Sequence, residues 1–166
     1  MLIRRAFKFE LKPDGRQACQ IGKFCGCARY VYNRTLSLEK SLYAKDDKHS
    51  FRYTEATKRL PEWKNKHPFL KECHSQMLHQ SLKDLDRAYT NFLEKRANFP
   101  KYRKKFRHDS IRFPQGVELD EAKHQIRLPI SGTPAVVKRF ISGTPAVVKR
   151  FRIKFFFSLA KQDLFP

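Results

Sequence analysis

Hydrophobic and charged residues alternate along residues 2–12 of the chain. The apolar positions that share one side of an extended backbone are Ile3, Phe7, Phe9 and Leu11. A period of two predicts a half-buried β-strand. Residues 13–15, Pro-Asp-Gly, interrupt this pattern. Asp14 followed three residues later by Gln17 is typical of a helix N-cap with its capping-box partner.

A period of three to four residues then replaces the alternation and predicts a long helix over about residues 15–44. Its apolar stripe consists of Ala18, Ile21, Phe24, Cys25, Ala28, Val31, Tyr32 and Leu38. Thr54 is placed to cap a short helix that ends before Pro61. A second long helix is predicted over 75–97, with the stripe Leu78, Leu82, Leu85, Tyr89, Phe92 and Leu93. Residues 111–114, 116–119 and 125–129 predict three short strands, the last two joined by a turn at 120–124.

Residues 130–140 and 141–151 are the same eleven letters, ISGTPAVVKRF. Two copies of this length do not make a solenoid, which needs at least three larger repeats. The glycine and proline in each copy would also interrupt any continuous helix. Each copy retains the strand propensity of its Ala-Val-Val-Lys-Arg-Phe part. We interpret the pair as the trace of a duplication and expect the divergent tail 130–166 to be poorly ordered.

The net charge of the chain limits the classes of function that are compatible with it. The 166 residues contain 36 Lys and Arg against 16 Asp and Glu, a formal net charge of +20. Such an excess favours a polyanionic partner, nucleic acid first and an anionic membrane surface second. No apolar stretch approaches the roughly 20 residues that a membrane span needs, and no signal peptide is recognisable. We therefore expect a cytoplasmic protein with reduced cysteines and no membrane partner.

The cations are concentrated between residues 95 and 112, which contain eight Lys or Arg and one acid. Interleaved aromatic residues can stack on bases while the cations contact phosphates. The alternative is a solvated basic linker between a helical part and a strand part. The candidate nucleic-acid-binding residues are Lys101, Tyr102, Arg103, Lys104, Lys105, Phe106, Arg107 and Arg112. On the first long helix, Arg29, Tyr30 and Asn33 are weaker candidates, because Tyr30 and Asn33 could serve only to pack or to cap.

The sequence contains no recognisable catalytic or metal-binding pattern. Cys25 and Cys27 lack the two-residue spacer of zinc knuckles and no second pair matches them, so buried structural thiols are the better interpretation for the four cysteines. The histidines form no metal motif, and no nucleophile elbow or phosphate-binding loop occurs. The acidic residues mostly fall on predicted helix surfaces. The sequence thus predicts no cofactor for this chain.

Several stretches together resemble one family of proteins. They are RAFKFELKPDGRQ at 5–17, GCARYVYNRTLSLEK at 26–40, PFLKECHSQMLHQSLKDLDRAYTNFLEKR at 68–96 and FPKYRKKFRHDSIRFPQGVELDEAKHQIRLP at 99–129. This order of motifs is similar to the OrfB (TnpB-type) proteins of bacterial and archaeal insertion sequences. Members of that family are transposon-encoded, RNA-guided DNA endonucleases.

The resemblance implies an α+β fold, in which a helical recognition-type insert of two long helices and a short one joins an incomplete wedge-like β-barrel. The wedge-like strands would lie at 1–12 and 110–129, the insert at 13–97 and a basic connector at 98–109. The family's other half is a RuvC-like nuclease, which holds Mg²⁺ through acidic ligands and usually a Zn²⁺ ribbon. No residue of that nuclease can be assigned here, so the chain is expected not to be an enzyme by itself.

The function that follows is that of a nucleic-acid-binding fragment of a transposase. It would hold guide-type RNA, an RNA–DNA heteroduplex or DNA in a nucleoid-associated setting, with base pairing supplying most of the sequence specificity. Two alternatives stay open: a degenerate remnant without a role, or an active endonuclease component that acts with a separately encoded RuvC-like half.

Overall fold

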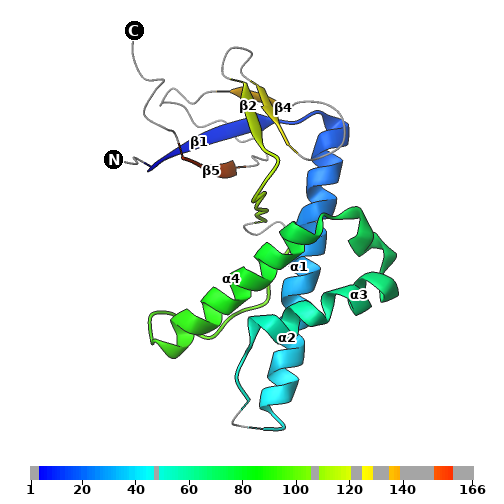
Figure 1. Ribbon diagram of the computed structural model, residues 1–166, viewed down its shortest axis with the longest axis vertical. Helices are drawn as coiled ribbons and strands as arrows, with labels where there is room; N and C mark the ends of the chain where they lie inside the picture. The colour runs from blue at the N-terminus through cyan, green and yellow to red at the C-terminus, as the bar shows by residue number, and fades with distance from the viewer. Residues whose placement is uncertain are drawn as a thin grey trace. The chain divides into compact units, whose positions relative to one another are not determined.

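The computed structural model describes residues 4–46, 49–105, 109–120, 125–128, 135–138 and 152–158 (Figure 1). The chain divides into two compact units. One contains Met1–Ala18 with Gly116–Pro166, and the other is Cys19–Gln115.

The first unit contains the strands. They are β1 (Arg4–Lys12), β2 (Glu118–Asp120), β3 (Gln125–Arg127), β4 (Ala135–Lys138) and β5 (Arg152–Ser158). All pair antiparallel in one sheet with the order β2-β3-β4-β1-β5. The strand β1 lies between β4 and β5, with Phe7 opposite Phe155 and Leu11 opposite Val137. The alternation at 2–12 therefore predicted a strand correctly, and the first copy of the repeat supplies β4.

The predicted fold class is wrong. The described part of the chain is mostly helical, and Cys19–Gln115 forms a small helical domain. The described strands form an open sheet with β2 and β5 at its two edges, so no incomplete β-barrel is shown. Residues 111–114 are not a strand, and the second repeat copy and residues 121–124 lie outside the described residues. The domain boundaries proposed from the sequence, including a poorly ordered tail, stay a prediction.

Helix α1 spans Gly15–Tyr43, as its periodicity predicted. Its start is the expected capping box. The Gln17 amide donates to Oδ1 of Asp14 at 2.7 Å, and the Asp14 amide donates to Oε1 of Gln17 at 3.1 Å. These bonds satisfy backbone donors that the first turn would otherwise leave unpaired. The buried side chains of α1 are Gln17, Ile21, Phe24, Cys25, Cys27, Ala28, Val31, Tyr32, Thr35, Leu36 and Glu39.

Helix α4 spans Ser75–Leu93 and crosses α1 obliquely within the helical unit (Figure 1). It ends four residues before the predicted limit of 97. There Lys95 adopts a left-handed conformation (φ 58°), and the amides of Arg96 and Ala97 donate back to the carbonyl of Asn91. Such a turn satisfies carbonyls at a helix C-terminus and reverses the chain.

The interface between α1 and α4 is the centre of the helical unit. Leu85 of α4 packs with Tyr32 and Leu36 of α1 in a buried cluster, which Phe51 and Tyr89 extend. A buried hydroxyl adds one polar link, because Oγ of Ser81 donates to the carbonyl of Ala28 at 2.6 Å. These contacts fix α4 against α1 at the point where the two helices cross.

The segment between α1 and α4 forms α2 (Tyr53–Lys58), α3 (Leu60–Lys66) and the 3-10 helix η1 (Pro68–Glu72). The predicted short helix corresponds to α2, but its N-cap is Arg52 rather than Thr54. The helix α3 was missed, because Pro61 was interpreted as a break although proline is well tolerated in a first helical turn. Leu60, Trp63 and Leu70 anchor this segment in the core.

Candidate nucleic-acid interface

The basic segment (residues 99–105) is held against α1 by Asn33. The side-chain amide of Asn33 donates to the carbonyl of Arg103 at 2.9 Å, and its Oδ1 accepts from the Arg103 amide at 2.8 Å. An asparagine side chain can satisfy one backbone donor and one backbone acceptor at once. Asn33 therefore pairs with the Arg103 backbone much as a residue of a neighbouring β-strand would. The predicted basic connector is therefore attached to α1 rather than fully solvated.

The side chain of Arg103 adds a second attachment. Its guanidinium carbon lies 4.0 Å from the centre of the Tyr32 ring, and Nη2 lies 3.0 Å from Oδ2 of Asp84 on α4. Arg112 reaches the other oxygen of Asp84 at 3.1 Å. Burial raises the pKa of the Tyr32 hydroxyl, and the charge of Arg103 partly opposes that shift. One carboxylate thus holds two of the predicted nucleic-acid-binding arginines.

A third attachment lies nearer the start of α1. Nη1 of Arg29 forms an ion pair with Oδ1 of Asp109 at 2.7 Å, with both side chains three-quarters or more buried. Such partly buried, charge-assisted hydrogen bonds are stronger than exposed ion pairs. Arg29 therefore helps to position Asp109 relative to α1.

Aromatic side chains surround the start of the basic segment. The ammonium of Lys40 lies 4.7 Å from the ring centre of Tyr102 and 5.4 Å from that of Phe99. Phe99 also makes edge-on contacts with Tyr89 and Phe92 of α4. Burial raises the pKa of Tyr89 to about 12. Tyr102 remains 46% exposed, which leaves part of its ring accessible to a ligand.

The structure thus brings together most of the predicted residues that it describes. Arg29, Asn33, Tyr102, Arg103 and Arg112 are joined through contacts with α1 or Asp84. Lys101, Lys104 and Lys105 are exposed on the same segment. Phe106 and Arg107 lie outside the described residues. Whether this set contacts nucleic acid stays a prediction.

Tyr30 belongs to a different cluster. Its hydroxyl lies 2.8 Å from Nε2 of His67, and its ring contacts Phe69 edge-on, with 5.3 Å between ring centres. Phe69, Asp84 and Lys40 were not among the residues predicted from the sequence. A usable signal existed for Lys40, since it follows Asn33 by seven residues and therefore lies on the same face of α1. For Asp84 the sequence offered no comparable signal.

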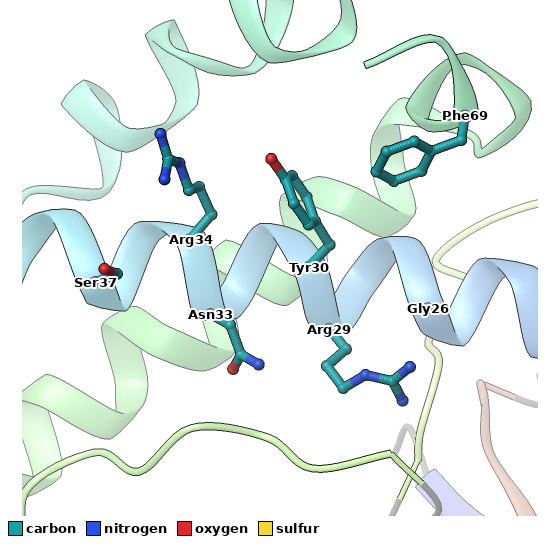
Figure 2. A pocket seen from close by; sticks show the side chains of 7 residues that line it. All are labelled: Gly26, Arg29, Tyr30, Asn33, Arg34, Ser37 and Phe69. Atoms are coloured by element: carbon teal, nitrogen blue, oxygen red, sulfur yellow. The ribbon is translucent and has the colours of Figure 1, made fainter. Parts of the chain in front are cut away.

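A hollow of about 520 Å³ runs along one face of α1, and we call it the α1 groove. In Figure 2, Arg29 and Asn33 leave one side of the helix, whereas Tyr30 and Arg34 leave the other, where Phe69 lies beside Tyr30. The residues that line the α1 groove are Gly26, Arg29, Tyr30, Asn33, Arg34, Ser37 and Phe69. None of these lining residues is acidic.

The cysteines are mostly buried, as predicted. Cys25, Cys27 and Cys73 are buried, but the prediction was wrong for Cys19, which is exposed. Burial, with a smaller contribution from the Asp109 carboxylate, raises the pKa of Cys25 to about 11. Among the described residues no group of three or more His, Cys, Asp or Glu is placed to hold a metal ion. No described helix is both long and apolar enough to span a membrane.

Comparison with known sequences defines the class of protein. Residues 1–48 match a family profile described as a helix-turn-helix domain of the OrfB type; the described part of this stretch contains β1 and the whole of α1. The chain is 44% identical over 130 residues to "Putative RNA-guided DNA endonuclease InsQ" of Escherichia coli K12. It is 36% identical over 104 residues to "Putative RNA-guided DNA endonuclease" of Streptomyces pristinaespiralis.

These matches confirm the resemblance seen in the sequence: the chain belongs to the OrfB/TnpB-type proteins of insertion sequences. The aligned regions cover 77% and 61% of this chain. They correspond to 32% of the InsQ relative and 25% of the Streptomyces relative. The chain therefore spans about a third or less of the curated relatives that it matches.

Proposed function

We propose that this chain binds nucleic acid through the basic segment and the adjoining faces of α1 and α4, as part of an OrfB/TnpB-type, RNA-guided DNA-targeting system. The family membership and the net charge of +20 support a polyanionic ligand. The names of the relatives favour guide-type RNA, an RNA–DNA heteroduplex or DNA as that ligand. A separately encoded RuvC-like half is the corresponding protein partner.

One observation carries the proposal more than any other: Asn33 fixes the backbone of the basic segment at Arg103 while lysines on either side of that point stay exposed. Lys101 and Lys104 have no ion-pair partner among the residues that the structure describes. A segment already fixed in place loses less conformational entropy when it binds. Two accessible cations on a held backbone are therefore better suited to phosphates than the same cations on a free linker.

The arrangement favours recognition of the backbone over recognition of base sequence. Lysine contacts phosphates as a compact charge, and phosphate contacts position a ligand without reading its sequence. Arg103 and Arg112, which have the fork geometry for base edges, are already bonded to Asp84. We infer that sequence specificity in this system comes from base pairing by the guide, while this chain holds the strands.

The test is a salt titration of the full chain with three labelled ligands: a DNA duplex, an RNA hairpin and an RNA–DNA hybrid. About six phosphate contacts would give a slope of log affinity against log salt of roughly −4 to −5. Replacing Lys101 and Lys104 together by Gln should reduce the magnitude of that slope by about 1.4 to 1.8, because two contacts are lost. Arg103 stays unchanged, so the attachment to α1 is retained.

A matched control separates this site from the general effect of net charge. Lys45 and Lys58 are exposed lysines of the same helical unit outside the basic segment. Replacing both by Gln removes the same charge and should change the slope much less. A slope near zero with all three ligands would refute nucleic-acid binding. Equal effects of the two double variants would refute the basic segment as the binding surface.

A further inference from the structure

The α1 groove combines three features that suit one part of a nucleic acid. At Gly26 the bottom of the groove has no side chain, and an added Cβ there would meet only Nη2 of Arg29, at 4.0 Å. One wall presents Phe69, whose ring is part of a side chain that is 43% exposed. Arg34 is exposed on the same side of α1, beyond Tyr30 (Figure 2). A flat apolar surface thus lies near an accessible cation.

The charges of the α1 groove are complementary to a phosphate. Arg29 is engaged with Asp109, but Arg34 has no acidic partner among the residues that the structure describes. The Tyr30 hydroxyl is bonded to His67, and the Tyr30 ring contacts Phe69 edge-on, so these contacts hold the exposed aromatic surface in place. A fixed aromatic ring is suited to stack on a base, because every base has a π-face.

We propose that the α1 groove is a subsite for one unpaired nucleotide of the bound nucleic acid, with its base stacked on Phe69 and its phosphate at Arg34. This inference rests on the proposed function, and it adds a site distinct from the basic segment. Neither Phe69 nor Arg34 belongs to the set of nucleic-acid-binding residues predicted from the sequence. A base-paired strand does not offer a free base face, so this subsite selects single strands over a closed duplex.

Two variants test the subsite in different ways. Phe69→Ala removes the stacking surface and should weaken binding of single strands about 5- to 150-fold, the range expected for loss of one stacked base. Gly26→Gln fills the floor without adding charge, and the open space at Gly26 makes the substitution compatible with the fold. Gly22→Gln is the matched control, because Gly22 lies one turn earlier on α1, outside the groove, with nothing within 4 Å of an added Cβ.

The experiment measures binding of the full chain to a homothymidine oligonucleotide, a homouridine oligonucleotide, a blunt DNA duplex and a polyglutamate peptide. Phe69→Ala and Gly26→Gln should weaken binding of the single strands and leave the blunt duplex unchanged, whereas Gly22→Gln should alter neither. The two oligonucleotides distinguish a DNA strand from an RNA strand as the occupant. Circular dichroism of each variant confirms that the helices are retained.

Three results would overturn the inference. Single-strand binding of Gly26→Gln equal to that of wild type would exclude the groove. An equal loss for the blunt duplex would show that no unpaired base is involved. Polyglutamate binding weakened as strongly as oligonucleotide binding would identify an acidic peptide as the occupant. If wild type bound no nucleic acid at all, the proposed function itself would fail, whereas salt-dependent binding that both variants retain would refute only the subsite.

Discussion

Replacing Asn33 by alanine should release the basic segment from α1. The substitution removes both hydrogen bonds to the Arg103 backbone, which are 2.9 and 2.8 Å long. Each contributes about 1 kcal/mol net, so the segment should lose about 2 kcal/mol of local stability. An opening equilibrium that shifts by this amount corresponds to roughly 30-fold faster amide exchange at Arg103.

Hydrogen exchange followed by mass spectrometry on peptides that cover residues 99–105 measures this change directly. Asn65→Ala is the control, because Asn65 is an exposed asparagine of α3 whose side chain makes no hydrogen bond among the described contacts. It should leave exchange in 99–105 at the wild-type rate. Unchanged exchange in Asn33→Ala would show that Asp84 and Tyr32 hold the segment without Asn33, and would refute the account of pre-organised binding given above.

Three further predictions concern the core and its titratable groups. Leu85→Ala should lower the free energy of unfolding by about 2–5 kcal/mol in urea titrations, whereas Leu93→Ala, at a site 73% exposed, should change it little. Folding raises the pKa of Cys25 from 9.0 to about 11 and that of Tyr89 from 10.0 to about 12. Their contributions are complete below the unfolded values, so unfolding free energy should fall as pH rises from 9 to 12; a flat profile would contradict the burial described. Iodoacetamide should label the exposed Cys19 before Cys25, and equal labelling rates by mass spectrometry would contradict the structure.

The sequence predicted individual helices and strands better than it predicted how they pack together. A period of two correctly located β1, and a period of about 3.6 correctly located α1 and the start of α4. The same alternation said nothing about sheet closure, because it reports the two faces of a strand and not its neighbours. The partners of β1 are β4 and β5, which lie more than a hundred residues further along the chain. The incorrect barrel prediction came from the family resemblance, and the local pattern of the sequence contained nothing that could have corrected it.

The candidate site was likewise predicted only in part from the sequence. Composition located the basic segment, since charge density and aromatic spacing are properties of consecutive residues. The attachment of Arg103 to Asn33 joins residues 70 positions apart, and Asp84 was one unremarked acid on a predicted helix surface. The α1 groove depends on η1 lying beside α1, which no local pattern encodes. Contacts between distant segments therefore had to come from the structure.

The distance along the chain between Asn33 and Arg103 also constrains the order of folding. Closing a loop of 70 residues costs about 4 kcal/mol in chain entropy, which is more than the roughly 2 kcal/mol from two hydrogen bonds. Once α1 and α4 have packed through Leu85, the remaining loop from Asp84 to Arg103 is only 19 residues. We therefore expect the basic segment to dock after the helices, so that during synthesis its cations stay undocked until the helical core has formed.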